Sequence, residues 1–296
     1  MSFEDLKPQF LKQEDVGAQN LAQARKQLHY TIFTLQAVAA AYAPFQEDSS
    51  HISFQWNRES GAFLSGKIPG KKDGAVFGLI LETPAVIQLD SSEKERRRLS
   101  MGGVTLAGLQ EWLREGVKGM GLDSQTLDFS LSKEMPPHEL AQGKPFDYSG
   151  LGGALAELKR AYSNAHLFLE RIHQENSQFS PVRCWPHDFD LTTLLEFQVS
   201  DDPNPKKTLR IGLSPGDSFY ETPYYYVTPR PFSMDLTLPP LPSGGRWRLE
   251  DRQGAVMTHE ALLRSKELEL QFKAVSDFLL TTRQIGLHFL KVGQKR

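Results

Sequence analysis

The stretch RCWPHDFDLTTLLEF, residues 183–197, gathers side chains that could do chemistry. It holds Trp185, His187 and the carboxylates Asp188 and Asp190, together with the only cysteine of the chain, Cys184. Carboxylates beside a histidine can act as general acid and base or as metal ligands. The stretch then turns apolar, so it is either an active-site strand or a core strand.

Read as one strand, the stretch has two faces, because alternate residues point to opposite sides. The polar face consists of Asp188, Asp190, Thr192, Glu196 and Gln198. The opposite face is largely apolar and includes His187, Phe189, Leu191, Leu195, Phe197 and Val199. On that face His187 is more simply a core or edge histidine than a ligand. The two aspartates could also serve only to accept hydrogen bonds from backbone N–H groups at the start of a strand.

Later segments add polar residues to the predicted site. Arg210 lies on the next predicted strand, Asp217 in the turn SPGD, and Tyr224 and Tyr226 in YYYVT. The candidate ligand-binding residues are Asp188, Asp190, Arg210, Asp217, Tyr224 and Tyr226, with Trp185, His187 and Glu221 as weaker candidates. Simpler interpretations stay open. The composition of SPGD is that of an ordinary turn. Glu221 and Glu82 both begin an ETP tripeptide, which points to a shared structural role.

An internal duplication is expected to position these residues. Apolar residues recur at helical spacing over 18–42 and again over 153–175. The two stripes are in register, and the interval that separates them also separates Gly78 from Gly212. Two ETP tripeptides are spaced slightly further apart, so the second copy carries about five extra residues near Asp217.

The remaining elements favour an α+β fold with antiparallel strands. We expect helices near 104–118, 259–264 and 267–290, and strands near 126–132 and 232–238. The linker-like stretch 133–153 suggests repeats at 1–145 and 146–296, which could pack as one unit. The apolar stripe of 267–290 is most simply core, with a homodimer seam as the second reading.

Composition bounds the class of protein. The 296 residues are 39% hydrophobic and 24% charged, with net charge −2, so nucleic acid and anionic membranes are not expected as partners. One cysteine excludes an internal disulfide framework, and no signal peptide or membrane-spanning segment is evident; both features point to the cytoplasm. Cys184 itself reads as a small buried hydrophobic residue.

Cofactor and metal motifs are absent from the sequence. There is no His-Glu-x-x-His, Cys-x-x-Cys or Walker motif, and we expect no metal and no cofactor. The glycines of SGLGG (149–153) precede a predicted helix but follow no predicted strand. A dinucleotide-binding site needs a strand before its glycines, so it is not expected here. The basic run KERRR (94–98) could meet an anionic partner but is more simply a solvated loop.

The chain resembles a bacterial family of unknown function over roughly 182–231. The resemblance rests on WPHDFDLTT, GLSPGD and ETPYYYVTPRP, which match a W-P-H-x-F-D-L strand, a G-x-x-P-G-D turn and a tyrosine-rich strand. Asp188 stands where a second histidine is often found, which weakens a metal site built on two histidines. The family implies fold and placement but no activity.

Three functional hypotheses therefore remain. The first is binding of a small polar ligand on the polar face of the second repeat, with or without catalysis. The second is a scaffold or interaction protein that performs no chemistry. The third is a metal-dependent hydrolase that uses the carboxylates. The sequence does not decide whether the protein is an enzyme.

Overall fold

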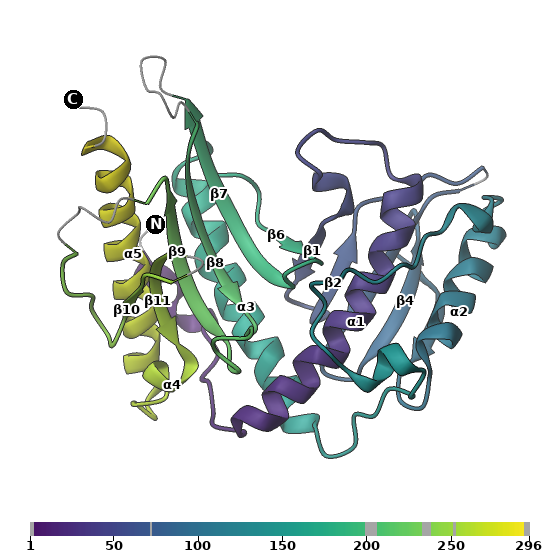
Figure 1. Ribbon diagram of the computed structural model, residues 1–296, viewed down its shortest axis with the longest axis horizontal. Coiled ribbons are helices and arrows are strands. Elements are labelled where there is room, and N and C mark those ends of the chain that lie inside the picture. The colour runs from purple at the N-terminus through teal and green to yellow at the C-terminus, as the bar shows by residue number, and fades with distance from the viewer. Residues whose placement is uncertain (1–2, 72, 199–205, 233–237, 251–252, 293–296) are drawn as a thin grey trace. The chain divides into compact units, whose positions relative to one another are not determined.

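The computed structural model describes residues 3–71, 73–198, 206–232, 238–250 and 253–292. Within these residues the fold is α+β, with antiparallel strands and a long C-terminal helix (Figure 1). The chain forms two compact units. Unit 1 consists of Met1–Asp15, Arg160–Val182 and Asp190–Arg296, and unit 2 of Val16–Lys159 and Arg183–Phe189. The units are thus interleaved along the chain rather than being two consecutive halves.

Unit 2 contains an antiparallel sheet in the order β6-β1-β2-β3-β4-β5. Its elements are α1 (Ala18–Tyr42), η2 (Ser50–Ile52), β1 (Phe54–Asn57), β2 (Ala62–Ser65), β3 (Ala75–Ile80), β4 (Ala85–Asp90), β5 (Glu95–Ser100), α2 (Leu106–Gly119), η3 (Ser124–Thr126), η4 (Glu139–Gln142), the start of α3 (Gly152–Glu175) and β6 (Arg183–Trp185). Helix α2 begins at an N-cap, where the side chain of Thr105 accepts a hydrogen bond from the backbone N–H of Gly108. It buries an apolar stripe that includes Leu109 and Leu113.

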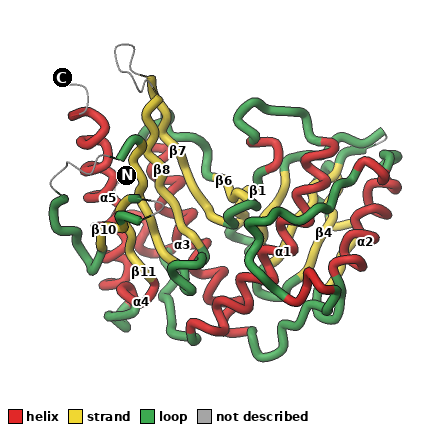
Figure 2. The backbone as a smooth tube through the Cα atoms, viewed as in Figure 1, coloured by secondary structure: helices red, strands yellow, loops and turns green. Residues whose placement is uncertain are grey.

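Unit 1 contains an antiparallel sheet in the order β10-β11-β9-β8-β7 (Figure 2). Its elements are η1 (Phe3–Gln9), the rest of α3, β7 (Asp190–Gln198), β8 (Lys206–Ser214), β9 (Tyr224–Arg230), β10 (Arg246–Arg248), β11 (Gly254–Thr258), α4 (His259–Leu262) and α5 (Leu268–Val292). Helix α5 contacts β8 and β9. Phe10, Phe168 and Phe272 pack together in the core, with ring centroids 5.5 to 6.2 Å apart.

The helix predictions are confirmed, because the apolar stripes on which they rest are buried. The helices expected over 18–42, 153–175 and 267–290 are α1, α3 and α5, and those expected near 104–118 and 259–264 are α2 and the short α4. On α5, Phe272, Val275 and Leu279 are buried within this chain, which fits the core reading of the stripe.

Two strand predictions are wrong. The expected strand over 183–197 is interrupted by a turn at 186–189, so β6 ends at Trp185 and β7 begins at Asp190. The segment 126–132 is not a strand: it follows η3 and runs on as irregular backbone. The strand expected near 232–238 lies almost wholly in 233–237, outside the described residues.

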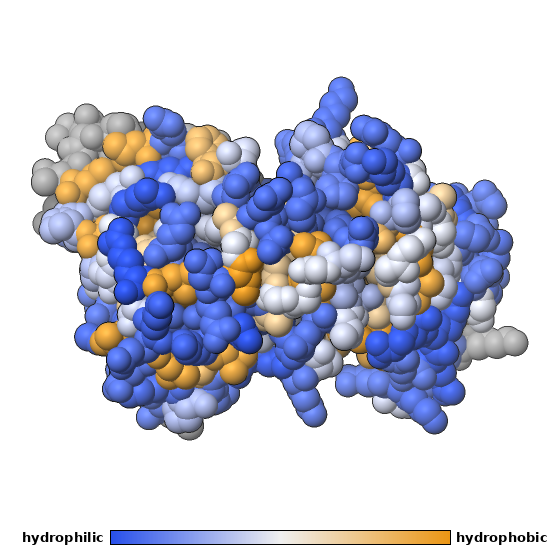
Figure 3. Space-filling view, turned by 90° about the horizontal axis from the view of Figure 1, so that it is seen from below, coloured by the Kyte–Doolittle hydropathy of each residue, from blue (hydrophilic) through white to orange (hydrophobic). Residues whose placement is uncertain are grey.

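The surface seen in Figure 3 is mixed. Hydrophobic residues reach this face in small groups separated by hydrophilic ones. A broad continuous apolar patch would mark a large protein–protein interface, and this view does not display one.

Candidate functional site

The polar face predicted for residues 190–226 exists within unit 1. The strand register places Thr192 on β7 opposite Gly212 on β8, and Gly212 opposite Tyr226 on β9. The period of two then brings Asp190, Arg210, Ser214 and Tyr224 to the same face. Five of these side chains are almost completely buried: Asp190, Thr192, Ser214, Tyr224 and Tyr226.

Asp190 and Tyr226 form a hydrogen-bonded pair across β8. The Tyr226 hydroxyl donates to Oδ2 of Asp190. Gly212 makes this reach possible, because a Cβ there would lie 2.7 Å from the Tyr226 hydroxyl. Burial and then the charge of Asp190 raise the pKa of Tyr226 well above its usual value, so the tyrosine stays protonated and donates. Asp190 is only 1% exposed, so an incoming ligand cannot touch this pair without the face opening.

Asp217 is the acceptor of a second network. Its Oδ1 accepts the backbone N–H groups of Phe219 and Tyr220 at 2.7 and 2.9 Å. Its Oδ2 accepts the Tyr224 hydroxyl at 2.7 Å and Nη1 of Arg248 at 3.3 Å. Burial alone would raise the pKa of Asp217, but the hydrogen bonds from Tyr224 and the two backbone N–H groups hold it below its usual value. Because Asp217 accepts four hydrogen bonds, it stabilises the SPGD turn in which it lies.

Arg248 was missed in the sequence because it reaches Asp217 from β10, a strand far along the chain from the SPGD turn. Its side chain is 5% exposed, and its guanidinium lies 4.0 Å from the ring centroid of Phe219. A charged group this deeply buried needs such partners. The SPGD segment is thus a turn that packs against Arg248.

The remaining predicted residues of this motif lie elsewhere. Trp185 ends β6, and His187 and Asp188 lie in the turn that interrupts the expected strand, with His187 Nε2 3.4 Å from Asp188 Oδ2. The prediction that His187 lies on an apolar face opposite Asp188 is therefore wrong: its side chain is 48% exposed. Glu221 is exposed in the loop before β9.

His29 of α1 holds this turn from within unit 2. Its Nε2 lies 2.8 Å from the carbonyl oxygen of Pro186, and its ring stacks on Phe189 with centroids 5.6 Å apart. Phe189 adopts a positive φ of 56°, which lets the chain turn and bury that ring. Burial lowers the pKa of His29 to about 4, so the imidazole is neutral at physiological pH. These contacts hold the turn at 186–189 in place, and Cys184 on β6 is buried as expected.

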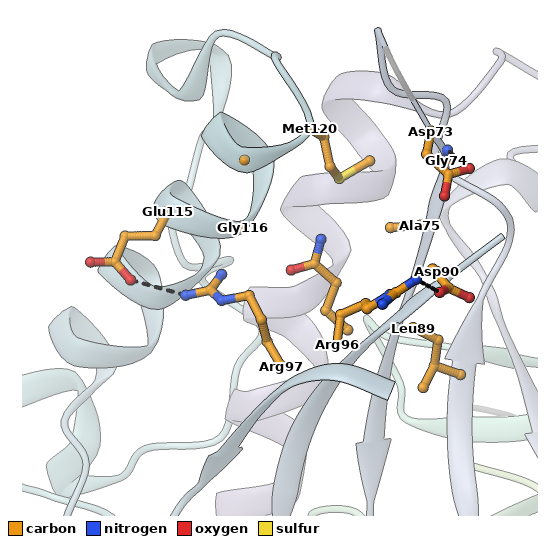
Figure 4. Close-up of a pocket in the computed structure, with 12 residues that line it drawn as sticks. Asp73, Gly74, Ala75, Leu89, Asp90, Arg96, Arg97, Glu115, Gly116 and Met120 are labelled. Carbon is orange, nitrogen blue, oxygen red and sulfur yellow. Dashed lines mark hydrogen bonds and ion pairs between the residues drawn. The ribbon is translucent and has the colours of Figure 1, made fainter. Parts of the chain in front are cut away.

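A pocket in unit 2 was not predicted. We call it the α2 pocket. Its cavity of about 270 Å³ is lined by Asp73, Gly74, Ala75, Gln88, Leu89, Asp90, Arg96, Arg97, Glu115, Gly116, Gly119 and Met120. These residues come from β3, β4 and β5, from α2 and from the segments beside them (Figure 4). The volume is near the lower end of small-molecule sites.

A β-bulge brings two consecutive arginines to this pocket. Gln88 pairs with Arg97 and Leu89 with Glu95, so Arg96 is the extra residue on β5. In a regular strand Arg96 and Arg97 would point to opposite faces; the bulge lets both line the pocket. Residues 95–98 of the basic run thus belong to β5 beside a pocket and not to a loop, although most of them are exposed to solvent.

Each arginine is held by a carboxylate (Figure 4). Arg96 Nη2 lies 2.5 Å from Asp90 Oδ2. Arg97 donates from Nη2 to Glu115 at 2.9 Å and from Nη1 to the carbonyl oxygen of Trp112 at 3.0 Å, and its guanidinium lies 4.4 Å from the Trp112 ring centroid. The backbone N–H of Lys94, above all, lowers the pKa of Asp90. Arg97 is therefore fixed in direction before any ligand arrives.

Gln88 is the unusual group in the pocket wall. It is 7% exposed, and among the described residues its Oε1 has no hydrogen-bond partner. A Cβ on Gly116 would lie 3.0 Å from this oxygen and 2.8 Å from Arg97 Nη1, so a larger residue on α2 would displace one or both of these side-chain ends. The signal in the sequence was a single amide inside the apolar run AVIQL of β4.

Two further properties of the described residues concern metal binding and membranes. No three His, Cys, Asp or Glu side chains there are grouped so that they could bind a metal ion. None of the described helices combines the length and apolar character needed to cross a bilayer.

Comparison with known proteins gives no relative that could assign a role to either region. No family model, no curated protein and no solved structure matches this chain. The resemblance of 182–231 to a family of unknown function therefore stays a prediction.

Proposed function

We propose that this protein binds a small molecule in the α2 pocket. The observation that carries the proposal is the buried Oε1 of Gln88 in the pocket wall, which has no partner among the described residues. An unsatisfied buried amide oxygen costs about 1–3 kcal/mol of stability. Natural proteins retain such a cost chiefly where function requires it.

We further propose that the two units are copies of one ancestral unit, which supplies an internal comparison. The starts of α1 and α3, at Ala18 and Gly152, are separated by the same interval as the two apolar stripes of the sequence. The starts of β4 and β9 are separated by the same interval as the two ETP tripeptides. With these offsets Phe77 corresponds to Ile211 and Gln88 to Val227.

The comparison indicates that the fold does not need a polar residue at Gln88. In unit 2 the cross-strand row beneath α2 is Phe77–Gln88–Arg97. The corresponding row in unit 1 is Ile211–Val227–Ala255, and all three residues are buried. A Cβ on Gly286 of α5 would lie 2.6 Å from Leu209 and 3.7 Å from Val227, so a helix glycine also lies close to this apolar row. The polar row of unit 2 is thus a departure that packing does not require.

The polar face of unit 1 supports ligand binding less well. Asp190 is buried under Tyr226, and Asp217 already accepts four hydrogen bonds. These networks fit the scaffold hypothesis for that face. For the hydrolase hypothesis, Asp190 is buried and already accepts the Tyr226 hydroxyl, so this carboxylate is not available to a substrate.

The test is to block the pocket and look for lost binding. Gly119 lines the pocket and no atom lies within 4 Å of a Cβ built on it, so Gly119→Phe is the substitution chosen to add a ring at the pocket. Gly102→Phe is the matched control, because Gly102 is exposed, has equally open surroundings and lies outside the pocket.

Saturation-transfer NMR is run with a defined set of small amides, carboxylates, amines and sugars. We expect at least one compound to bind wild type and Gly102→Phe but not Gly119→Phe. If every compound that binds wild type also binds Gly119→Phe, or if none binds wild type, the proposal is wrong.

A further inference from the structure

The charges that line the α2 pocket leave no surplus cation for an anionic ligand. Two arginines face three carboxylates: Asp73, Asp90 and Glu115. Arg96 is paired with Asp90 and Arg97 with Glu115. An anion would have to displace one of these partners. A cation would have to compete with an arginine for Asp90 or Glu115, or approach Asp73, whose Oδ1 already accepts the backbone N–H of Gly74. An uncharged ligand meets neither obstacle.

The hydrogen-bonding groups call for a ligand with a donor and an acceptor side by side. The Gln88 side chain is a planar amide, which offers an acceptor oxygen and a donor nitrogen in one plane. Each terminal nitrogen of Arg97 uses one N–H on Trp112 or Glu115 and retains a second. An amide or lactam presents the complementary carbonyl oxygen and N–H in a planar group of its own.

The apolar part of the lining favours a ring. Ala75, Leu89 and Met120 contribute to the wall alongside the charged residues. The flexible thioether of methionine adapts to a flat apolar surface. A cavity of about 270 Å³ accommodates a molecule of one or two rings.

We infer that the α2 pocket binds a small uncharged molecule that carries an amide or lactam group on a ring, with Gln88 as the recognising side chain. This inference rests on the proposed function. It adds the class of ligand and the residue that selects it. Gln88 is here a binding residue with no catalytic role.

Nicotinamide and nicotinate are the probes for this inference. They share one ring and differ only in a carboxamide against a carboxylate. Each is titrated into the full chain by ligand-observed NMR, for wild type, Gln88→Met and Gln55→Met. Gln55 is the control, since it is an exposed glutamine on β1 of the same unit.

We expect nicotinamide to bind wild type and Gln55→Met at least about tenfold more tightly than nicotinate, and Gln88→Met to lose this preference, because one mispaired buried polar group costs about 1.4 kcal/mol or more. Equal or tighter binding of nicotinate overturns the inference, as does nicotinamide binding that survives Gln88→Met or its absence in wild type. These results leave the proposed function standing if other compounds are still lost on Gly119→Phe. If no compound is lost there, the proposed function fails as well.

Discussion

Replacing Gln88 by methionine is expected to stabilise the protein. Methionine has nearly the length and shape of glutamine but carries no polar atom that burial leaves unpaired. The Oε1 without a partner costs about 1–3 kcal/mol, and the thioether adds apolar contact. Allowing for imperfect packing, we expect the free energy of unfolding to rise by about 1–2 kcal/mol. Function, not stability, would then explain the glutamine.

Urea unfolding followed by tryptophan fluorescence is a suitable assay. Three of the four tryptophans, Trp56, Trp112 and Trp185, belong to unit 2, so the signal reports mainly on the unit that carries the substitution. The midpoint should shift to higher urea with an unchanged slope. Gln55→Met, at an exposed strand position, should stay within about 0.5 kcal/mol of wild type.

The opposite result would refute the reasoning. If Gln88→Met lowers the free energy of unfolding by about 1 kcal/mol or more, the amide makes a stabilising hydrogen bond in solution. Arg97 is then the natural partner, since its Nη1 and the Gln88 oxygen both approach Gly116. The argument that unit 2 retains a costly polar residue would be lost.

Three further perturbations test other parts of the structure by urea unfolding. Gly116→Ala should destabilise relative to Gly119→Ala, because a Cβ on Gly116 would lie 2.8 Å from Arg97 Nη1, whereas a Cβ on Gly119, the last residue of α2, meets nothing within 4 Å and should change stability by less than about 0.5 kcal/mol; equal effects would contradict the close approach of α2. Tyr226→Phe should cost about 1–3 kcal/mol by removing the hydroxyl that donates to the buried Asp190, and an unchanged midpoint would show that the pair contributes nothing. His29 has a folded pKa of about 4 against 6.5 in the unfolded chain, so the unfolded chain binds more protons between these values and stability falls as the pH drops below about 6.5, by about 1.4 kcal/mol per unit. The advantage of wild type over His29→Gln should therefore shrink from pH 7 to pH 5, and parallel curves would disprove a neutral buried histidine.

Local periodicity predicted the elements in which the pattern of buried residues repeats regularly along the sequence. The helix stripes were sufficient because their apolar residues are buried, although α1 and α3 also bury polar residues on other faces, such as Thr31 and Asn164. The polar face of unit 1 followed from the period of two, since β7, β8 and β9 pair in regular register. The same rule failed at 183–197, where Phe189 turns its ring into the core with a positive φ, an arrangement that alternation cannot express.

The α2 pocket could not be predicted because it depends on distant choices. The bulge at Arg96 is defined only against β4, and the space beneath α2 depends on Gly116 of the helix meeting Gln88 of the sheet. The role of Arg248 could not be predicted for the same reason, because this residue is on β10 and its partner Asp217 lies in the SPGD turn, far away in the sequence. Periodicity describes one element at a time, whereas both features require two elements to be placed together.

The interleaving of the units sets an order in which the protein can be completed during synthesis. Gln13 and Gln271 exchange hydrogen bonds within unit 1, so the N-terminal segment waits for a partner 258 residues later. At about 5–20 residues per second this wait lasts roughly 13–50 s. Unit 2 has all its residues once Phe189 has been made, whereas unit 1 needs helix α5. The nascent chain should therefore acquire a ligand-ready α2 pocket while the other unit is still unfinished.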